Sequence, residues 1–225
     1  MPHAVDHNAI VDRFAPARGG MRHAFATLDP ARTAHVVIDM QNGFMEEGAP
    51  VEVPAARDIV ENINRISAAM RRAGGRNYFV RYTTPEDIGQ SWSVMMARLG
   101  GGADVHRGAF AVGAHHWQLW PELVVEDGDR IVDKARFSAF TPGTSDLHAI
   151  LQADGIDTLI ITGTLTNICC ESTARDAMQL DYRVIMAADA NAAPDDDAHA
   201  AALASLNLVF ADLRSTEEIE QLLAS

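Results

Sequence analysis

A chain of 225 residues with 48% apolar composition is long enough for one large hydrophobic core and shorter than chains that usually divide into several domains. Its 18 Lys and Arg against 31 Asp and Glu give a formal net charge of -13, which argues against nucleic acid and anionic membrane surfaces as partners. No apolar run has the length of a membrane span, the N-terminus lacks a signal-peptide pattern, and two adjacent cysteines form no disulfide framework. We therefore expect a single-domain, cytoplasmic protein.

Short apolar runs alternate along the chain with segments of helical periodicity. The runs are rich in Val, Ile, Tyr and Phe, as buried parallel strands are, and they lie at 35–40, 76–82, 130–134, 158–163, 182–189 and 207–212. Capping residues and a 3.6-residue apolar period predict helices at 54–75, 144–155, 166–181, 195–207 and 215–225. The alternation predicts an α/β fold, a three-layer α/β/α sandwich around a largely parallel sheet.

Residues 83–129 interrupt this alternation. They contain GGG at 100–102 and all three Trp, and their one plain helix signal is SWSVMMARLG at 91–100. Long irregular insertions in compact domains are usually functional lids or oligomer contacts. We expect this insertion to be a lid or an oligomer contact. We also expect the protein to be a homo-oligomer, either a dimer or a tetramer. Residues 1–32 are expected to be an N-terminal extension ahead of a single domain at 33–225.

Three chemically active side chains lie where ligands bind in such sheets, beyond the carboxyl ends of the strands. They are Asp39 in VVIDMQNGF, Lys134 in IVDKARFSAF and Cys169 in ITGTLTNICCESTARDA. Each alone has an ordinary structural explanation, as a turn residue, a surface cation or a small buried side chain. Together they form a plausible catalytic set, and the combination is what favours function.

The chemistry of that set is acyl transfer. A thiol in the first turn of a helix and beside an ammonium is expected to have a lowered pKa, which makes Cys169 an activated nucleophile. The Asp39 carboxylate is suited to take the thiol proton and pass it to a leaving amine. Backbone N–H groups of the turn GTLTN are suited to hold a developing oxyanion.

Cys169 and Cys170 are adjacent, and adjacent cysteines rarely pair because the eight-membered ring has poor geometry. Consecutive helix positions differ by about 100°, so only one of the two thiols is expected to face the site. We predict one nucleophile, Cys169, and one core residue, Cys170.

The motifs DMQNGF, DKARFSAF and GTLTNICCESTARDA, in this order, resemble those of the isochorismatase-like cysteine hydrolases, from about residue 33 to the end. That family includes ureidoacrylate and N-carbamoyl amidohydrolases, nicotinamidases and biuret hydrolases. The resemblance implies a six-stranded parallel sheet in the order 3-2-1-4-5-6 and an isochorismatase-like hydrolase domain. It also implies a catalytic triad of Asp39, Lys134 and Cys169, in which Cys169 is the nucleophile because it directly follows TNI.

Further site residues follow from the same alignment of motifs. The resemblance implies a cis peptide bond between Thr164 and Leu165 and an oxyanion hole formed by the backbone N–H groups of Leu165 and Cys169. As substrate-binding candidates we take the side chains of Phe44, Arg81, Trp92, Thr166 and Asn167.

No metal and no cofactor are expected. Nicotinamidases bind a metal through an Asp and several His shortly after the catalytic Asp, whereas this chain has no His between His35 and His106. His106 and the adjacent pair His115 and His116 are expected to be solvated or to pack in the insertion. Trp117 and Trp120, three residues apart, are expected to pack on one face of a helix.

The resulting functional hypothesis is a cofactor-free amidohydrolase. It would cleave the C–N bond of a small linear amide, N-carbamoyl or ureido compound through a thioester, with release of ammonia. Two alternatives remain open at the level of sequence. One is an isochorismatase-type vinyl ether hydrolase, and the other is a non-catalytic thiol redox sensor or interaction protein on the same fold.

Overall fold

The computed structural model describes residues 3–224 and contains one six-stranded, all-parallel sheet in the order β3-β2-β1-β4-β5-β6. This confirms the fold class and the strand order implied by the resemblance. The strands are β1 (Thr33–Ile38), β2 (Arg76–Tyr82), β3 (Arg130–Lys134), β4 (Thr158–Thr164), β5 (Arg183–Ala192) and β6 (Asp212–Arg214).

Segments that contain helices connect the strands, as parallel pairing of successive strands requires. The α-helices are α1 (His7–Phe14), α2 (Asn42–Met45), α3 (Val60–Arg72), α4 (Ile88–Ser91), α5 (Ser93–Leu99), α6 (Ala103–Ala109), α7 (Leu147–Ala153), α8 (Glu171–Gln179), α9 (Asp196–Val209) and α10 (Thr216–Ala224). Shorter 3-10 segments are η1 (Ala15–Arg18), η2 (Pro30–Arg32), η3 (Pro54–Ile59) and η4 (Gly100–Gly102), and a π-helical turn, η5 (Thr166–Cys170), precedes α8.

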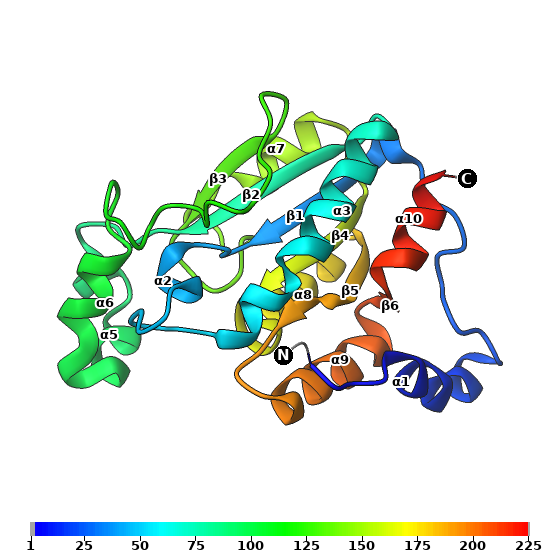
Figure 1. Cartoon of the computed structure of the whole chain (residues 1–225), viewed down its shortest axis with the longest axis horizontal. Coiled ribbons are helices and arrows are strands. Elements are labelled where there is room, and N and C mark those ends of the chain that lie inside the picture. The colour runs from blue at the N-terminus through cyan, green and yellow to red at the C-terminus, as the bar shows by residue number, and fades with distance from the viewer. Residues whose placement is uncertain (1–2, 225) are drawn as a thin grey trace.

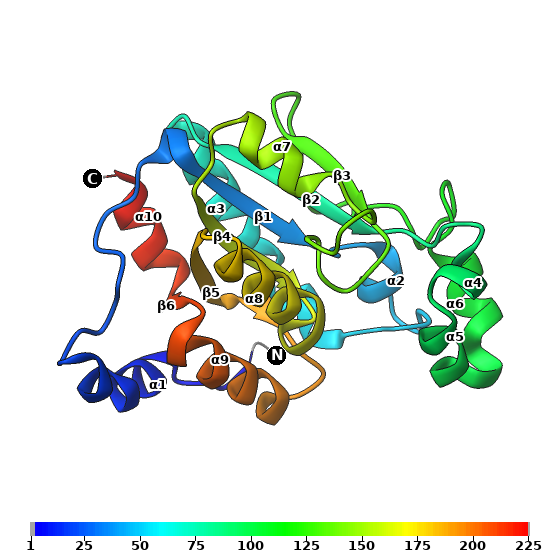
Figure 2. The ribbon, with the colours of Figure 1, turned by 180° about the vertical axis from the view of Figure 1, so that it is seen from behind.

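The helices form two layers. α3 and α10 cover one face of the sheet and lie in front of it in Figure 1, while α7 and α8 cover the opposite face and lie in front in Figure 2. α9 packs beside α8 on the second face. Within residues 3–224, no helix has both the length and the apolar character needed to cross a membrane.

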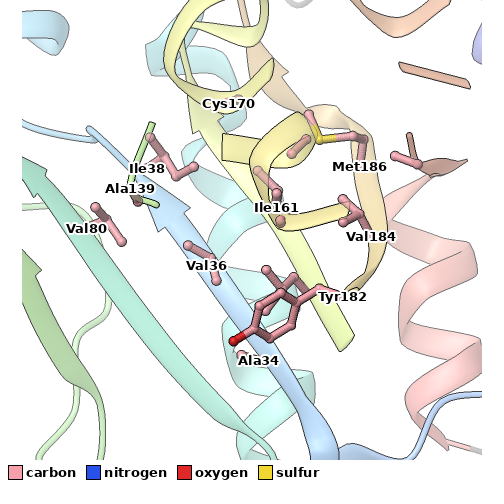
Figure 3. Close-up of a cluster of buried hydrophobic side chains, with 14 of the residues drawn as sticks. Ala34, Val36, Ile38, Val80, Ala139, Ile161, Cys170, Tyr182, Val184 and Met186 are labelled. Atoms are coloured by element: carbon pink, nitrogen blue, oxygen red, sulfur yellow. The ribbon is translucent and has the colours of Figure 1, made fainter. Parts of the chain in front are cut away.

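Both faces of the sheet are buried, which explains the continuous apolar runs of the sequence. In β1, Ala34, Val36 and Ile38 join the core under α7, α8 and α9, and Figure 3 shows them in a row with side chains of the neighbouring strands. The alternate residue Val37 joins the core under α3 and α10. The central strand is thus fixed from both sides, and so is the position of the residue that follows it.

The sixth strand lies later in the sequence than predicted. Residues 207–209 continue helix α9, and only Asp212–Arg214 pair with β5. Leu208 and Val209 are 51% and 60% exposed on the helix surface, so their apolar side chains do not mark a buried strand. The prediction was wrong because a short apolar run does not distinguish a strand from the end of a helix.

The insertion at residues 83–129 contains more helix than the sequence indicated. α4, α5 and α6 lie together beyond the carboxyl ends of the strands (Figures 1 and 2), whereas the sequence indicated one helix, at 91–100. The prediction of a helix through Trp117 and Trp120 was wrong, because this part of the chain forms turns. Trp117 instead lies under the Arg81 guanidinium, with Cζ of Arg81 3.7 Å from the centre of the Trp117 ring. The Trp117 Nε1–H donates to Thr83 Oγ1 at 2.8 Å.

The N-terminal extension packs on the domain. Val11 of α1 is fully buried in the core that α9 covers. The N–H groups of Ala24 and Phe25 both donate to the carboxylate of Asp212 in β6, at 2.9 and 2.8 Å. Figure 1 shows α1 beside α9, far from the insertion.

Candidate active site

The two central strands bring the first groups of the site together. β1 and β4 pair in register as far as Ile38 and Gly163, and Asp39 follows β1 directly. Asp39 has a left-handed backbone with φ 54°, and its N–H donates to the Val80 carbonyl at 2.9 Å. Gly163 has φ 117°, and a Cβ there would lie 2.1 Å from the Ile38 carbonyl oxygen. The close approach of the strands beside Asp39 therefore requires glycine at position 163.

Lys134, the last residue of β3, pairs with Asp39 across β2. Its Nζ donates to Asp39 Oδ2 at 2.8 Å and to the Arg136 carbonyl at 3.0 Å, and both side chains of the ion pair are fully buried. Burial lowers the pKa of Lys134, but the charge of Asp39, its hydrogen bond and the neighbouring cysteines together outweigh burial, and the pKa is raised overall. Burial raises the pKa of Asp39, which Lys134 offsets only in part. The result is a charged ammonium beside a carboxylate more basic than an exposed aspartate.

Cys169 lies in the π-helical turn η5, where we predicted the first turn of an ordinary α-helix. The peptide bond between Thr164 and Leu165 that leads into the turn is cis. The N–H groups of Ile168 and Cys170 both donate to the Leu165 carbonyl at 3.1 Å, which fixes the turn around the nucleophile position.

The two cysteines point to different places. Cys169 is 4% exposed and lines a cavity, whereas Cys170 is fully buried in the core, with its sulfur 4.0 Å from the Thr162 carbonyl oxygen. Figure 3 draws the core cluster to which Cys170 belongs, together with Met186.

The prediction of a lowered pKa for the Cys169 thiol was wrong. Burial raises the pKa, the charge of Asp39 raises it further, and Lys134 opposes the shift only in part. Cys169 is therefore a neutral thiol that needs a base. The thiol interacts with the Asp39 carboxylate.

A cavity of about 300 Å³ lies above Cys169, and nearly all of its lining is apolar. Its walls come from the segment after β1, from the insertion and from the turns after β3 and β4. Side chains of these segments that line it include Phe44, Met95, Leu99, Phe137, Leu165 and Ile168.

The sequence-predicted substrate-binding residues lie in different places. Phe44 lines the cavity, but Arg81 and Trp92 do not. Arg81 of β2 instead donates to Asp133 of the neighbouring strand β3 at 2.9 and 3.3 Å. Trp92 packs edge-on against Phe137, with ring centroids 4.8 Å apart, and so supports the wall from behind.

Thr166 and Asn167 also lie outside the lining. Thr166 is fully buried, and its Oγ1 is 2.8 Å from His199 Nδ1. His199 Nε2 is 3.1 Å from the Ala188 carbonyl, so Nε2 carries the proton and the Thr166 hydroxyl donates to Nδ1. Thr166 therefore holds η5 against α9, and His3 of the extension stacks on His199 at 4.3 Å.

Sequence reasoning missed two residues that hold the site together. Gln41 is fully buried; its Oε1 accepts from the Tyr82 N–H at 2.7 Å, and its Nε2 donates to the carbonyls of Tyr82 and Trp117. It thereby ties the segment after Asp39 to β2 and to the insertion. The other is Gly163. The sequence did contain a signal for each residue: Gln41 is a polar amide just after a buried strand, and Gly163 is a glycine inside a strand.

Among residues 3–224, one cluster could hold a metal ion. Glu46, His115 and His116 each offer a ligand atom, and these atoms lie within 4.8 Å of one another. His115 Nε2 is 2.9 Å from Glu46 Oε2, and both side chains are largely exposed. None of the three lines the cavity above Cys169. The absence of a metal requirement remains a prediction.

The fold and the site together are those of a hydrolase built on a parallel α/β sheet. The family model described as the Isochorismatase domain matches residues 33–218, and the chain belongs to this family.

Relatives and solved structures support the same placement. The chain is 32% identical over 206 residues to ureidoacrylate amidohydrolase RutB of Pseudomonas savastanoi pv. phaseolicola, which covers 85% of this chain and 83% of that protein. It is 35% identical over 171 residues to a probable inactive nicotinamidase of Arabidopsis thaliana, with 75% and 85% covered. A crystal structure of a cysteine hydrolase from Pseudomonas syringae pv. phaseolicola superposes with a TM-score of 0.81 at 28% identity, covering 89% of this chain and 96% of that one.

Proposed function

We propose that this protein is a cofactor-free cysteine amidohydrolase that cleaves the C–N bond of a small linear amide, N-carbamoyl or ureido compound and releases ammonia. The observation that carries the proposal is the placement of the Cys169 thiol, in a largely apolar cavity and against the buried pair of Asp39 and Lys134. The similarity to a ureidoacrylate amidohydrolase supports the choice of C–N bond.

In the proposed reaction, Asp39 takes the proton of the Cys169 thiol as the sulfur attacks the substrate carbonyl carbon. The carbonyl π electrons move to oxygen, where the N–H groups of Leu165 and Cys169 stabilise the negative charge. The tetrahedral intermediate collapses, Asp39 returns the proton to the nitrogen, and ammonia departs. The acyl group remains on Cys169 as a thioester, or as a thiocarbamate when the substrate is a urea.

Water completes the cycle. Asp39 accepts a proton from water, the hydroxide adds to the acyl carbon, and the thiolate leaves and recovers the proton from Asp39. Lys134 keeps Asp39 in place and offsets its negative charge while the thiolate forms. Because the resting thiol is neutral, the base is essential to both half-reactions.

The test is ammonia release from small amides and ureas, measured with matched cysteine variants. Cys169→Ala and Cys169→Ser should lower kcat by at least about 1,000-fold, because the nucleophile is lost. Cys170→Ala should keep most of the activity, since its side chain packs in the core, and its loss of stability should be about 1–2 kcal/mol.

Equal loss of activity in the variants of both cysteines would contradict the assignment. Turnover by Cys169→Ala without ammonia release would favour vinyl ether hydrolysis instead. A redox sensor is disfavoured because both thiols are buried with raised pKa values. Full activity in the presence of a chelator is expected, and its loss would direct attention to Glu46, His115 and His116.

A further inference from the structure

The charges around the cavity restrict what can enter it. No Lys or Arg of the described chain lines the space above Cys169. Lys134 is held by Asp39 beneath the thiol, and Arg81 is paired with Asp133.

Arg136, two residues beyond Lys134, is also engaged elsewhere. Its guanidinium donates to the carbonyls of Ala135 at 2.7 Å and Ser91 at 2.5 Å, and its carbon Cζ lies 4.8 Å from the centre of the Trp92 ring. It therefore joins the turn after β3 to the insertion and leaves no cation facing the cavity.

Besides Tyr82 and Cys169, two polar side chains line the cavity, Glu52 and His106, and neither offers a positive charge. The Glu52 carboxylate accepts from Arg57 Nη2 at 2.9 Å and from the Gly48 N–H at 2.8 Å. His106 is buried, which lowers its pKa and keeps the ring neutral at pH 7, and its Nε2 lies 3.2 Å from the Tyr82 hydroxyl.

We propose that the substrate carries an uncharged hydrocarbon group on its amide or urea, a short alkyl chain or ring, rather than the carboxylate of a carbamoyl amino acid or ureido acid. This inference rests on the proposed amidohydrolase function and names its substrate class. A carboxylate placed in this cavity would lose its hydration without gaining a cation in exchange.

An alkyl group, in contrast, gains from the same surroundings. Phe44, Phe137, Met95 and Leu99 present carbon and sulfur atoms around the space above the thiol. Each methylene buried there should raise kcat/KM by about fourfold, until the cavity of about 300 Å³ is filled.

The test compares compounds of equal length that differ at one end. Hexanamide is matched with adipamate, which carries a carboxylate in place of the terminal methyl group, and with 6-aminohexanamide, which carries an ammonium. Propylurea is matched with 3-ureidopropionate in the same way. We expect kcat/KM for the neutral member to exceed that for either charged member by about 100-fold.

A preference for adipamate or 3-ureidopropionate would overturn the inference while leaving the amidohydrolase intact, and so would a preference for 6-aminohexanamide. Absence of Cys169-dependent ammonia release from all five compounds, and from ureidoacrylate and nicotinamide run beside them, would contradict the proposed function and this inference with it.

A pair of variants on α5 locates the effect. Met95 lines the cavity, whereas its neighbour Val94 is 71% exposed and does not. Met95→Arg should reduce the ratio of hexanamide to adipamate turnover at least tenfold, because it supplies the missing cation. Val94→Arg should leave the ratio unchanged. An equal change in both variants would show that overall charge, and not the lining of the cavity, sets the preference.

Discussion

The catalytic floor, which is Cys169 at the base of the cavity with Asp39 and Lys134 buried beneath it, and the insertion at 83–129 that forms part of the cavity wall are built in opposite ways. The floor side chains are at most 4% exposed and lie at or beyond the ends of three strands of one sheet. The insertion consists of short helices and turns, and it exposes large apolar side chains: Val94 at 71%, Val105 at 61% and Val112 at 72%.

This difference separates chemistry from specificity. The floor is held by strand pairing and a core on both faces of the sheet, so its geometry tolerates little change. The insertion is fixed by a few contacts, such as those of Gln41, Arg136 and Trp117, so it can vary in sequence while the catalytic groups stay in place.

The sharpest test of this contrast substitutes one glycine in each region. Gly163→Ala should destabilise the protein by more than about 4 kcal/mol, because the new Cβ would meet the backbone of β1 and because φ is positive there. Gly108→Ala in α6 has open space and should stabilise the insertion slightly, by about 0.5–1 kcal/mol. Chemical denaturation of both variants measures their stabilities. Comparable losses of stability in the two variants would contradict the contrast between the floor and the insertion.

Two ion pairs give the next largest difference. Lys134→Met should lower kcat by at least about 100-fold and stability by about 3–5 kcal/mol, because it leaves Asp39 buried without its partner. Arg81→Met removes a partly exposed pair with Asp133 and should change stability by less than about 1 kcal/mol. If Lys134→Met folds and turns over like the parent protein, the proposed role of the pair is wrong.

Acid should destabilise the sheet beneath the floor. His35 of β1 is fully buried, and burial lowers its pKa from 6.5 to about 3, so the folded protein keeps it neutral. The unfolded chain takes up a proton below pH 6.5, so stability should fall as the pH drops from there toward 3, by up to about 4 kcal/mol. Denaturation at several pH values should show a shallower fall for His35→Gln. A pH profile of stability for His35→Gln that parallels that of the parent protein would contradict the assignment.

The smallest effect is expected in the insertion itself. Met95→Ala should raise KM for hexanamide by about five- to tenfold with little change in kcat, because it removes apolar contact and leaves the floor intact. Steady-state kinetics separates the two constants. A fall in kcat without a change in KM would mean that the insertion acts on the chemistry.

The apolar runs predicted a largely parallel sheet, and the family resemblance implied its strand order. The positions of Asp39, Lys134 and Cys169 at or just beyond strand ends predicted that they lie at one edge of the sheet, where Lys134 contacts Asp39. Position at a strand end fixes position in space when the strands are parallel and paired in register. The same reasoning misplaced the sixth strand, since Leu208 and Val209 are apolar but exposed.

The protonation state of Cys169 and the lining of the cavity could not be predicted from the sequence. The pKa of the thiol depends on burial and on the distance to two opposite charges, which no local motif encodes. Arg81 looked suited to a substrate from its place in the chain, but Asp133 on the adjacent strand binds it. The contacts of the insertion are long-range ones between irregular segments, so periodicity gives no signal for them.

The most direct test of the central claim is to trap the acyl enzyme. The protein is mixed with hexanamide, propylurea or ureidoacrylate, quenched in acid during turnover, digested and analysed by mass spectrometry. The account predicts an acyl or carbamoyl adduct on Cys169 and an unmodified Cys170, although both thiols lie in one peptide, so fragmentation must separate them. Turnover with no adduct on Cys169 under any quench time, or with the adduct on Cys170, would contradict it.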